Sequence, residues 1–562
     1  MATTVTSSHE PEISEKNIAT HGIDIEKSPS NEPQEKDEES DGTTFKQNGV
    51  KGIEATTSVW DYKTLWLMFC LLYLVSFSDK LLMSIQSNLN PYITSSFEEH
   101  GLTPTVSIAA TILSGVLQMP IAKILDVWGR VEGFIVLIFI NVLGNIIKCT
   151  CQNMFAYAAG HTIYWAGHIG LLYVIDIMLA DMTTLRNRII IYGLNGTPLI
   201  ATTFAGPKIA ELFYERVNFR WAFGAFIIIL VAFCIPVIMV LLWHRRKAYK
   251  QGLLVKESSG RTWYQSVWYY TIQLDALGLL LCMVGWALLL LPFNLASSAG
   301  KGWKNASMIA MEIIGFFTLV AWVVWEKYFA PIQMLPFRYL KDRTIIGACL
   351  LYGIMFCSIF CWDSYYYSYL QVAHDLDIST AGYVLNSFSL ASAILSPSSE
   401  LLSDTPTSVA LLVMCQVFNG IGTGIWASCA QLGIMASVDH QQIAICLALF
   451  GLFGSIGAAL GYAIAGALWV NILPAALIRE LPEGSKDLWS EIFSSLVIQQ
   501  QWPVGDPIRD AIIRAYADVQ RKMVIAGSAL VPLMVICIIM FKNTNVRKLE
   551  EEKGKQTKGA VF

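Results

Sequence analysis

Long apolar stretches alternate with short polar segments between residues 64 and 541 of this chain. About thirteen of them approach or exceed the ~20 residues that a helix needs to cross the hydrocarbon core of a bilayer. The run 226–243 is apolar on all sides, whereas a helix on the surface of a soluble domain keeps one polar face. The predicted membrane helices span 64–86, 104–125, 132–150, 154–178, 188–213, 221–243, 274–295, 306–326, 344–372, 378–397, 407–434, 443–471 and 521–541.

These stretches predict an all-α integral membrane protein that is surrounded by the lipid bilayer. Helices and closed barrels are the only folds that satisfy the backbone hydrogen bonds in lipid, and continuous apolar runs lack the alternation of a barrel. The composition agrees, since 54% of the residues are hydrophobic, 15% are charged, and the mean hydropathy is +0.50. A net charge of −4 gives no reason to expect a nucleic acid as a partner.

Twelve cysteines are scattered along the chain without a CxxC pair, which predicts small packing residues and no disulfide framework. The sequence contains no set of His and Cys at metal-ligand spacing, and no HExxH, GxGD or nucleotide-binding loop. We therefore expect no cofactor, no protein metal site and no enzymatic activity.

Changes in composition divide the chain into parts. The first 58 residues are rich in Ser, Glu, Lys and Asp, which predicts a disordered cytosolic tail and no cleavable signal peptide. The predicted parts are this tail (1–58), a six-helix half (59–243), a cytosolic basic loop (244–273), two linking membrane helices (274–326), a second half (327–541) with a long loop (475–519), and a charged tail (542–562).

Basic residues predict the orientation, because the cytosolic loops of membrane proteins carry an excess of Lys and Arg. The basic segments 186–188, 244–261 and 338–343 all fall in the cytosol if the amino terminus lies there. Thirteen crossings would then leave the basic tail 542–562 outside, against the same rule. The polar stretch 396–406 has no Lys or Arg, and we interpret it as the position of a missing helix. The alternative is an ordinary short loop and an imperfect charge rule.

A tight charged loop joins the second and third predicted helices. It reads Lys-Ile-Leu-Asp-Val-Trp-Gly-Arg-Val-Glu-Gly over residues 123–133. Gly129 permits a turn, and Asp126 and Arg130 are placed to pair with each other or with a helix end. An Asp–Arg pair alone is common and contributes little on a surface, but its position after the second of many membrane helices makes it informative. It resembles the DxxGR signature of the major facilitator superfamily, in which this loop holds the cytosolic gate.

Further stretches narrow the resemblance. Together with the loop at 123–133, they resemble the fungal siderophore–iron transporters, a fourteen-helix branch of the major facilitator superfamily, from about residue 60 to residue 543. They are ADMTTLRNR (180–188), FAGPK (204–208), GRTW (260–263), LPFNL (291–295), LPF (335–337), KDRTIIGAC (341–349), SYLQV (368–372), AGY (381–383), VMCQ (413–416), DHQ (439–441) and LWVNILP (468–474).

The resemblance implies proton-coupled import of ferric siderophore chelates by alternating access, at the plasma membrane or in endosomal vesicles. The partners that it implies are a ferric siderophore, protons and the lipid bilayer. The chelate already saturates the iron with oxygen atoms, so no protein ligand to iron is implied. The sequence departs from the family at 396–406, where the family carries a basic loop and one more helix. It departs again at Ala430, where the family pattern has Glu beside Gln431.

Ionisable residues within apolar stretches are candidates for proton coupling, because charge is costly in lipid. Asp79 lies beside Lys80 in the first predicted helix, where the alternative is a pair at its outer end. His161 and Asp176 are fifteen residues apart, about four turns, with His168 midway, so the three lie along one stripe of the fourth predicted helix. We expect Asp176, His161, His168 and Asp79 to carry protons; the alternative is hydrogen bonding between helices.

The ninth predicted helix ends in the aromatic run 361–371, which contains one carboxylate. Tyrosine and tryptophan favour the lipid–water boundary, so an aromatic belt is one interpretation. Four tyrosines within five residues exceed what anchoring requires, and consecutive helical residues point in different directions. We therefore expect Asp363, Tyr366 and Tyr369 to line a cavity for a bulky, polar chelate.

Two segments on the predicted outer side remain. The loop 475–519 carries aromatic residues with short helical patterning, which predicts either a lid over the substrate or an amphipathic segment on the membrane surface. Asn305 begins an Asn-Ala-Ser glycosylation sequon in an outer loop.

Two other functions remain open at this point. A proton antiporter that exports drugs or glutathione would share the helix number and the charged loop. A non-transporting or defective family member is favoured by the departure at 396–406. Uptake of a radio-iron chelate that a protonophore abolishes would distinguish import from both.

Overall fold

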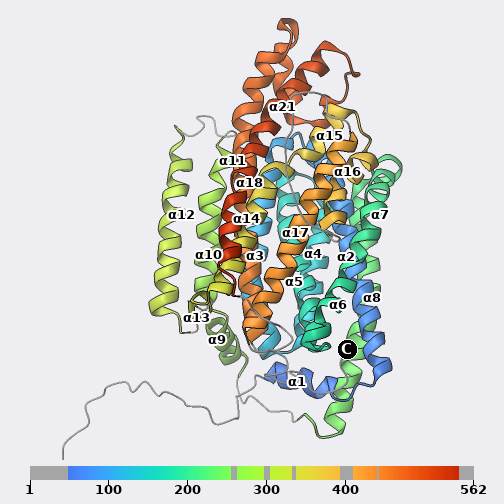
Figure 1. Cartoon of the computed structure of the whole chain (residues 1–562), viewed down its shortest axis with the longest axis vertical. Helices are drawn as coiled ribbons and strands as arrows, with labels where there is room; N and C mark the ends of the chain where they lie inside the picture. The colour runs from blue at the N-terminus through green and yellow to red at the C-terminus, as the bar shows by residue number, and fades with distance from the viewer. Residues whose placement is uncertain are drawn as a thin grey trace, which may run out of the picture. The chain divides into compact units, whose positions relative to one another are not determined.

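Helices form all of the regular structure in the described part of the chain, which contains no strand. The computed structural model describes residues 48–254, 262–296, 304–331, 337–392, 409–438 and 442–542. Figure 1 shows the long helices side by side along a common axis, with α1, α9 and α13 near one end and α15 and α21 near the other. The prediction of an all-α membrane protein is confirmed.

The first half of the bundle is a series of helices with short connections. Asp61 caps α2 by accepting the backbone N–H of Thr64, and Asn153 caps α5 by accepting that of Ala156. Such caps satisfy backbone donors that the first turn of a helix leaves unpaired. The helices are α1 (Asn48–Thr57), α2 (Tyr62–Ser96), α3 (Thr103–Val127), α4 (Arg130–Thr150), α5 (Met154–Asp181), α6 (Leu185–Gly196), α7 (Pro198–Leu212) and α8 (Phe219–Lys250).

A linking region joins the two halves. It begins with a capping box, in which Thr262 and Gln265 each accept the other's backbone N–H. The helices are α9 (Trp263–Gln273), α10 (Ala276–Leu290), α11 (Pro292–Leu295) and α12 (Ala306–Val324). The helix α10 packs against α12 and α3, and α11 packs against α18, so the linking pair lies against both halves.

The second half contains the remaining helices. Asp342 caps α14 and Asp506 caps α21, which also has Pro507 at its first position. The helices are α13 (Phe337–Leu340), α14 (Arg343–Asp363), α15 (Tyr366–His374), α16 (Ile378–Ser392), α17 (Val409–Ser437), α18 (Ile443–Glu480), α19 (Trp489–Ser494), α20 (Leu496–Gln499), α21 (Pro507–Ser528) and α22 (Val531–Ile539).

The predicted membrane helices coincide with helical structure where the structure describes them, but some predicted ends are wrong. Residues 393–397 and 407–408, at the ends of two predicted helices, lie outside the described part. The helix α2 continues through Pro91 to Ser96, beyond the predicted end at residue 86. The last predicted helix, 521–541, begins earlier, at Pro507, and is divided between α21 and α22. Hydropathy detects only the part of a helix that lies in lipid, so polar extensions beyond the membrane were missed.

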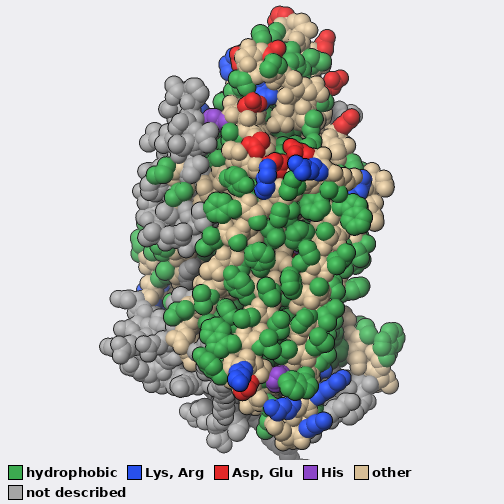
Figure 2. Space-filling view, turned by 90° about the vertical axis from the view of Figure 1, so that its right-hand side faces the viewer, with side chains coloured by type: hydrophobic (Ala, Val, Ile, Leu, Met, Phe, Trp, Pro, Cys, Tyr) green, Lys and Arg blue, Asp and Glu red, His purple; other side chains and the backbone are tan. Residues whose placement is uncertain are grey.

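Ten helices among the described residues are long and apolar enough to cross a membrane. Three predicted spans are not among them. The span 188–213 is divided between α6 and α7 at Thr197, and the spans 378–397 and 407–434 lie partly outside the described residues. Figure 2 shows a broad band of hydrophobic side chains between two ends that carry charged residues. Such a band matches the hydrocarbon core, and the charged ends match the two lipid–water interfaces.

Candidate functional site

A buried group of polar side chains joins α2, α4 and α5 in the middle of the first half. Nδ1 of His168 donates to Oδ2 of Asp79 at 2.6 Å. Nδ2 of Asn141 donates to Oδ1 of the same carboxylate at 3.1 Å, and Nδ2 of Asn145 donates to Oδ1 of Asn141 at 2.9 Å. All four residues are at most 1% exposed. The carboxylate of Asp79 is therefore held by groups from two other helices.

A second buried group lies two turns further toward the end of α2 and centres on Lys148. Its ammonium donates to Oε1 of Gln86, and Nε2 of Gln86 donates to Nδ1 of His161 at 2.6 Å. The same ammonium lies 3.6 Å from the centroid of the Tyr164 ring and 4.3 Å from that of Phe223. Lys148 is 0% exposed, and aromatic faces take the place of a carboxylate in its surroundings.

The ring of Tyr164 connects the two groups. It stacks on the ring of His168 at 5.7 Å between centroids and lies 6.2 Å from the ring of His161. Its hydroxyl is buried without a hydrogen-bond partner among the described residues. Titratable and polar groups therefore follow one another beside α5. We call this set the buried polar chain; its members are Lys148, Gln86, His161, Tyr164, His168, Asp79, Asn141 and Asn145.

The sequence identified Asp79, His161 and His168 but missed the residues that bind them. Asn141, Asn145 and Lys148 recur at intervals of four and three residues, so they form one polar face on an otherwise apolar α4. This spacing is the signal that could have identified them. Lys148 was overlooked because it lies near the predicted end of its helix, where a lysine normally reaches the lipid–water interface.

Asp176 lies apart from the buried polar chain. Its carboxyl group is half-buried and makes no hydrogen bond or ion pair with any described residue, while its backbone carbonyl accepts the hydroxyl of Tyr192 at 2.7 Å. Lys80 is close enough to interact with it electrostatically and donates to the carbonyl of Asn195 at 2.7 Å. The three residues expected along one stripe of this helix therefore lie in two separate places: His161 and His168 belong to the buried polar chain, and Asp176 lies near Lys80. Asp79 and Lys80 also have separate partners and form no pair at a helix end.

The charged loop lies at the ends of α3 and α4. Arg130 is 5% exposed, and its guanidinium donates to Oδ2 of Asp181 and to the carbonyl of Leu125, both at 2.9 Å. Gly129 adopts a φ of 122°, a conformation that residues with a side chain rarely adopt. The side chain of Asp126 lies outside the described part of the structure. The loop thus connects α3 with the end of α5.

In the aromatic run at the end of α14, some residues are packed in the core and others are only half-buried. The hydroxyl of Tyr365 donates to the carbonyl of Gly101 at 3.1 Å, so this residue belongs to the buried core. Tyr366 is 5% exposed and lies 6.2 Å from Tyr369, which is half-buried. Asp363 is half-buried and makes no hydrogen bond with a described residue. Asp363 and Tyr369 thus keep part of their surface free.

The two halves are joined at the outer end. Nε2 of Gln371 donates to the hydroxyl of Tyr92 at 2.5 Å, and the backbone N–H of Leu496 donates to Oγ of Ser95 at 3.0 Å. The ring of His100, which follows α2, lies 5.9 Å from the ring of Tyr365 and 6.1 Å from that of Trp469 in the second half. These polar contacts connect the end of α2 with α15 and with the segment that follows α18.

Arg509 fixes this outer segment. Its guanidinium is 0% exposed and donates to the carbonyls of Gln371 and Val372 in α15 and of Gln499 and Trp502 in the outer segment. A fixed fork of donors that binds several carbonyls holds the segment in one arrangement. The loop 475–519 is therefore a packed helical structure that is joined to α15.

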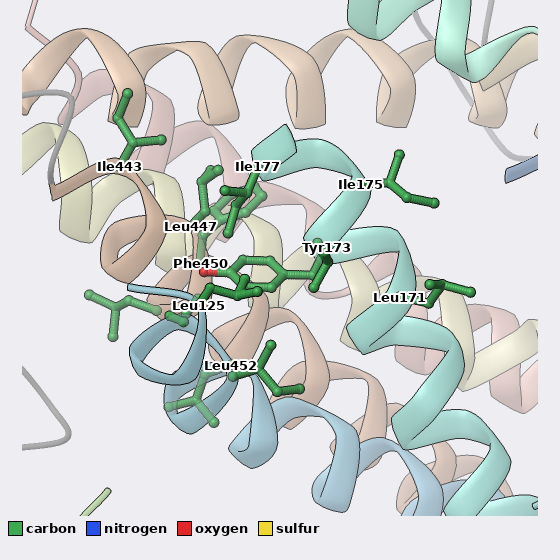
Figure 3. Close-up of a cluster of buried hydrophobic side chains, with 14 of the residues drawn as sticks. Leu125, Leu171, Tyr173, Ile175, Ile177, Ile443, Leu447, Phe450 and Leu452 are labelled. Atoms are coloured by element: carbon green, nitrogen blue, oxygen red, sulfur yellow. The ribbon is translucent and has the colours of Figure 1, made fainter. Parts of the chain in front are cut away.

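Apolar side chains join the halves at the inner end. Figure 3 shows Leu125 of α3 and Ile177 of α5 beside Leu447 and Phe450 of α18. All four are at most 6% exposed. Contacts between the halves are therefore polar and aromatic at the outer end and apolar at the inner end.

The buried polar chain can bind and pass protons but has no set of metal ligands. Among the described residues, no group of three or more His, Cys, Asp or Glu is placed to hold a metal ion. A carboxylate bonded to an imidazole and a lysine bonded to an amide can each exist in two protonation states.

Comparison with known proteins identifies the family. Residues 65–408 match the family model of the Major Facilitator Superfamily. A protein of Ajellomyces capsulatus named MFS siderochrome iron transporter 1 is 49% identical over 97% of this chain and 100% of its own length. The chain belongs to the fungal siderophore–iron transporters of this superfamily. Its relatives are transporters and not enzymes, and the chain is a multi-pass membrane protein.

Two other relatives agree. The MFS siderochrome iron transporter D of Aspergillus fumigatus and the siderophore iron transporter mirB of Emericella nidulans are each 37% identical over 92% of this chain. The alignments cover 90% of the length of the Aspergillus protein and 89% of that of the Emericella protein. The alignment with the Ajellomyces protein extends over 573 residues, whereas 97% of this chain amounts to about 545 residues. The relative therefore has residues that this chain lacks.

A solved structure supports the fold. A bacterial homologue of the human lysosomal transporter Spinster, in an inward-facing and unoccupied conformation, superposes with a TM-score of 0.53. The match covers 86% of this chain and 98% of that one at 10% sequence identity, so it concerns the fold alone.

Proposed function

We propose that this protein imports ferric siderophore chelates together with protons by alternating access. The observation that carries the proposal is the 49% identity, over the full length of the relative, with a protein named as a siderochrome iron transporter. The substrate is the complete chelate, so iron enters as cargo and the protein needs no ligand for the metal itself.

The buried polar chain supports coupling to protons. Asp79 and His168 share a hydrogen bond in a site that excludes water, and a proton gained or lost there changes the charge at the contact of α2 with α5. Such a change alters the balance between two arrangements of the helices, which is what coupling requires. Asp176, near Lys80, is the second proton-accepting position in this half.

The second half offers the surface for the chelate. Asp363 and Tyr369 keep part of their surface free, and Tyr462 of α18 lies close to Asp363. Phenol rings combine a hydrophobic face with a polar edge, which suits a bulky chelate with an oxygen-rich shell. Tyr366 is packed more tightly and supports the position of Tyr369.

The contacts between the halves support alternating access. Opening toward the outside must break the bonds of Tyr92 with Gln371 and of Ser95 with Leu496, while opening toward the inside must separate the apolar contacts of α18 with α3 and α5. Rocking of two halves about a central site needs two such alternative closures.

Uptake of a radio-iron chelate by yeast cells that lack their own siderophore transporters tests this proposal. We expect accumulation that rises when the medium is acidified and that a protonophore abolishes. The chelating molecule without iron and free ferric citrate serve as controls for the substrate. Efflux of preloaded chelate driven by outside protons, with no net uptake, would contradict import and would favour an antiporter.

A further inference from the structure

The linking region contacts the charged loop at the inner end of the bundle. Nζ of Lys123, in the last turns of α3, donates to the carbonyl of Gln273 at the end of α9, at 3.2 Å. The ring of Trp128 lies edge-on to that of Tyr270, with the centroids 5.0 Å apart. Lys123 and Trp128 both belong to the charged loop, and Figure 1 shows α9 near the inner end. The linking region is therefore in direct contact with the loop that joins α3 and α4.

Two buried carboxylates lie at the same end of the linking region. Asp275, between α9 and α10, is 3% exposed, and its Oδ1 accepts the backbone N–H of Gly278 at 3.3 Å and Nε1 of Trp325 at 2.9 Å. Glu326, in the short helical segment that follows α12, is 1% exposed. A Cβ atom at Gly278 would overlap Oδ2 of Asp275 and lie 3.2 Å from Oε1 of Glu326. The two carboxylates therefore converge on the first turn of α10.

The negative charge of Asp275 is not explained by the folding of the linking region. Oδ2 of Asp275 is buried without a hydrogen-bond partner among the described residues, and such burial of a carboxylate oxygen costs stability. An asparagine would keep the acceptor for Gly278 and Trp325 and would tolerate the φ of 44° at this position. Lys123 is close enough to both carboxylates to interact with them electrostatically. Attraction for this ammonium group is therefore the better explanation of the charge.

The other end of the same segment is fixed to the second half. The helices α10 and α11 follow one another with Leu291 between them, and we call residues 276–295 the linking segment. Asn294 of α11 is 0% exposed, and a Cβ atom at Gly466 of α18 would overlap its Oδ1. The helix α11 packs more on α18 than on α3, whereas α10 packs more on α3 than on α18. The linking segment thus holds the first half at its inner end and the second half at its outer end.

We infer that the linking segment ties the inner end of α3 to the second half and so helps to keep the inner end closed. Asp275 and Glu326 are positioning residues that act through Lys123, and their role in the transport cycle rests on the proposed function. Separation of α3 from α18 at the inner end must overcome this attraction as well as the apolar contacts around Leu447. The linking helices are then a working part of the inner closure and not only a connection between the halves.

A thiol at position 447 reports whether the inner end is open, because Leu447 is 6% exposed in the closed contact. Leu447→Cys is introduced into the full chain alone, with Asp275→Asn, with Lys123→Met and with both. Labelling of this thiol by a maleimide in the purified protein is followed by mass spectrometry, so the other cysteines can stay. Chelate uptake, surface abundance and the thermal unfolding midpoint are measured on the same variants. Asp487→Asn and Lys63→Met, at exposed positions, are the matched controls.

We expect Asp275→Asn and Lys123→Met each to label about fivefold faster or more, at unchanged abundance and midpoint. Uptake should fall by a similar factor, because an inner end that opens too easily slows the return to the outward-open state. The double variant should be affected no more than either single variant, since the two residues act through one contact.

Three results would overturn the inference. They are labelling at the parent's rate in both single variants, effects that add in the double variant, and faster labelling that only accompanies a lower unfolding midpoint. Faster labelling in the variants of a parent that takes up no chelate would instead overturn the proposed function alone.

Discussion

At the scale of single residues, the first half of the bundle buries charged and polar side chains in its interior, where loss of hydration makes them costly. Lys148 has an amide and two rings as its neighbours in place of a carboxylate, and Asp79 is held by an imidazole and an amide. A buried charge without an opposite charge at contact distance does little for stability. These residues are therefore better explained by function than by folding.

Replacement of Lys148 separates these roles. We expect Lys148→Met to lower chelate accumulation at least tenfold while thermal stability stays equal or rises, because an apolar residue of similar volume avoids the cost of burying an ammonium group that has no carboxylate at contact distance. Thermal unfolding of the purified protein and uptake at equal surface abundance measure the two effects. Lys63→Met, at an exposed position, is the matched control. A parallel fall of stability and uptake would assign Lys148 a structural role.

Asparagine at Asp176 or Asp79 tests which carboxyl group carries protons. Asparagine mimics a carboxyl group that is always protonated, so we expect Asp176→Asn to bind chelate and exchange it downhill but to lose proton-driven accumulation. We expect the same pattern for Asp79→Asn, since exchange needs only the conformational cycle. Asp487→Asn, on the exposed outer segment, is the control. Accumulation equal to that of the parent would make the substituted residue structural, and loss of binding would place it in contact with the chelate.

At the scale of elements, tight contacts between helices decide which substitutions are tolerated. The charged loop fixes α3 and α4 through Arg130, which is buried against Asp181. The helices α14 and α18 approach so closely that a Cβ atom at Gly457 would lie 1.9 Å from the carbonyl oxygen of Gly353. Small residues at such positions let helix backbones come together in membranes.

Arg130→Ala is expected to reduce both abundance and transport, because it removes one side of a buried ion pair with Asp181, and breaking such a pair typically costs about 3–5 kcal/mol. The double substitution of Arg130 and Asp181 by Met removes both charges. We expect it to restore most of the abundance and to leave transport at least tenfold low, because the loop no longer holds the gate. Surface labelling and uptake measure the two. Recovery of transport together with abundance would show that the ion pair serves folding alone.

Gly457→Ala is expected to destabilise the contact of α18 with α14 by about 1–3 kcal/mol, because the added methyl group overlaps a backbone oxygen that cannot move independently. Gly433→Ala is the matched control, since its Cβ atom would lie 3.5 Å from Thr344, an ordinary contact distance. Thermal unfolding of the two purified variants makes the comparison. Equal midpoints for both would show that α14 and α18 can separate without loss.

At the scale of the whole molecule, the two halves are connected at both ends by contacts of different character. The outer contacts are hydrogen bonds and edge-on contacts of the His100 ring, and Arg509 fixes the outer segment that makes some of them; the inner contacts are apolar. Because the outer contacts are polar and the inner contacts are apolar, a change in protonation or a bound substrate can affect the two ends differently.

The orientation of the molecule is open to direct measurement. Because basic residues lie at the end of α8 and just before α14, we expect the amino-terminal tail and the loop 244–273 to lie in the cytosol and Asn305 to lie outside. Protease protection of tags and glycosylation at Asn305 measure this. A tag at residue 255 that is accessible from outside intact cells would contradict the topology, whereas a tag near residue 485 should be accessible.

The sequence by itself determined the fold class, the order of the membrane helices and the family. The length of an apolar stretch predicts a membrane helix, because in lipid each helix must satisfy its own backbone hydrogen bonds. Each helix can therefore be predicted separately from its own sequence. It also predicted a role for Asp79, His161 and His168, since charged or titratable groups are conspicuous in an apolar stretch. Their proposed roles in transport stay predictions, as does that of Asp176. The missing helix predicted at 396–406 lies outside the described residues and also stays a prediction.

The tertiary structure alone decided which of these groups meet. Asp79 and His168 are far apart in the sequence, and their 2.6 Å contact depends on how α2 and α5 pack. Lys148 and Arg509 look like ordinary surface cations in the sequence, because Lys148 lies near the end of an apolar stretch, where a lysine normally reaches water, and Arg509 lies in a charged loop. Only the packing of neighbouring helices encloses them, and no local pattern in the sequence encodes that packing.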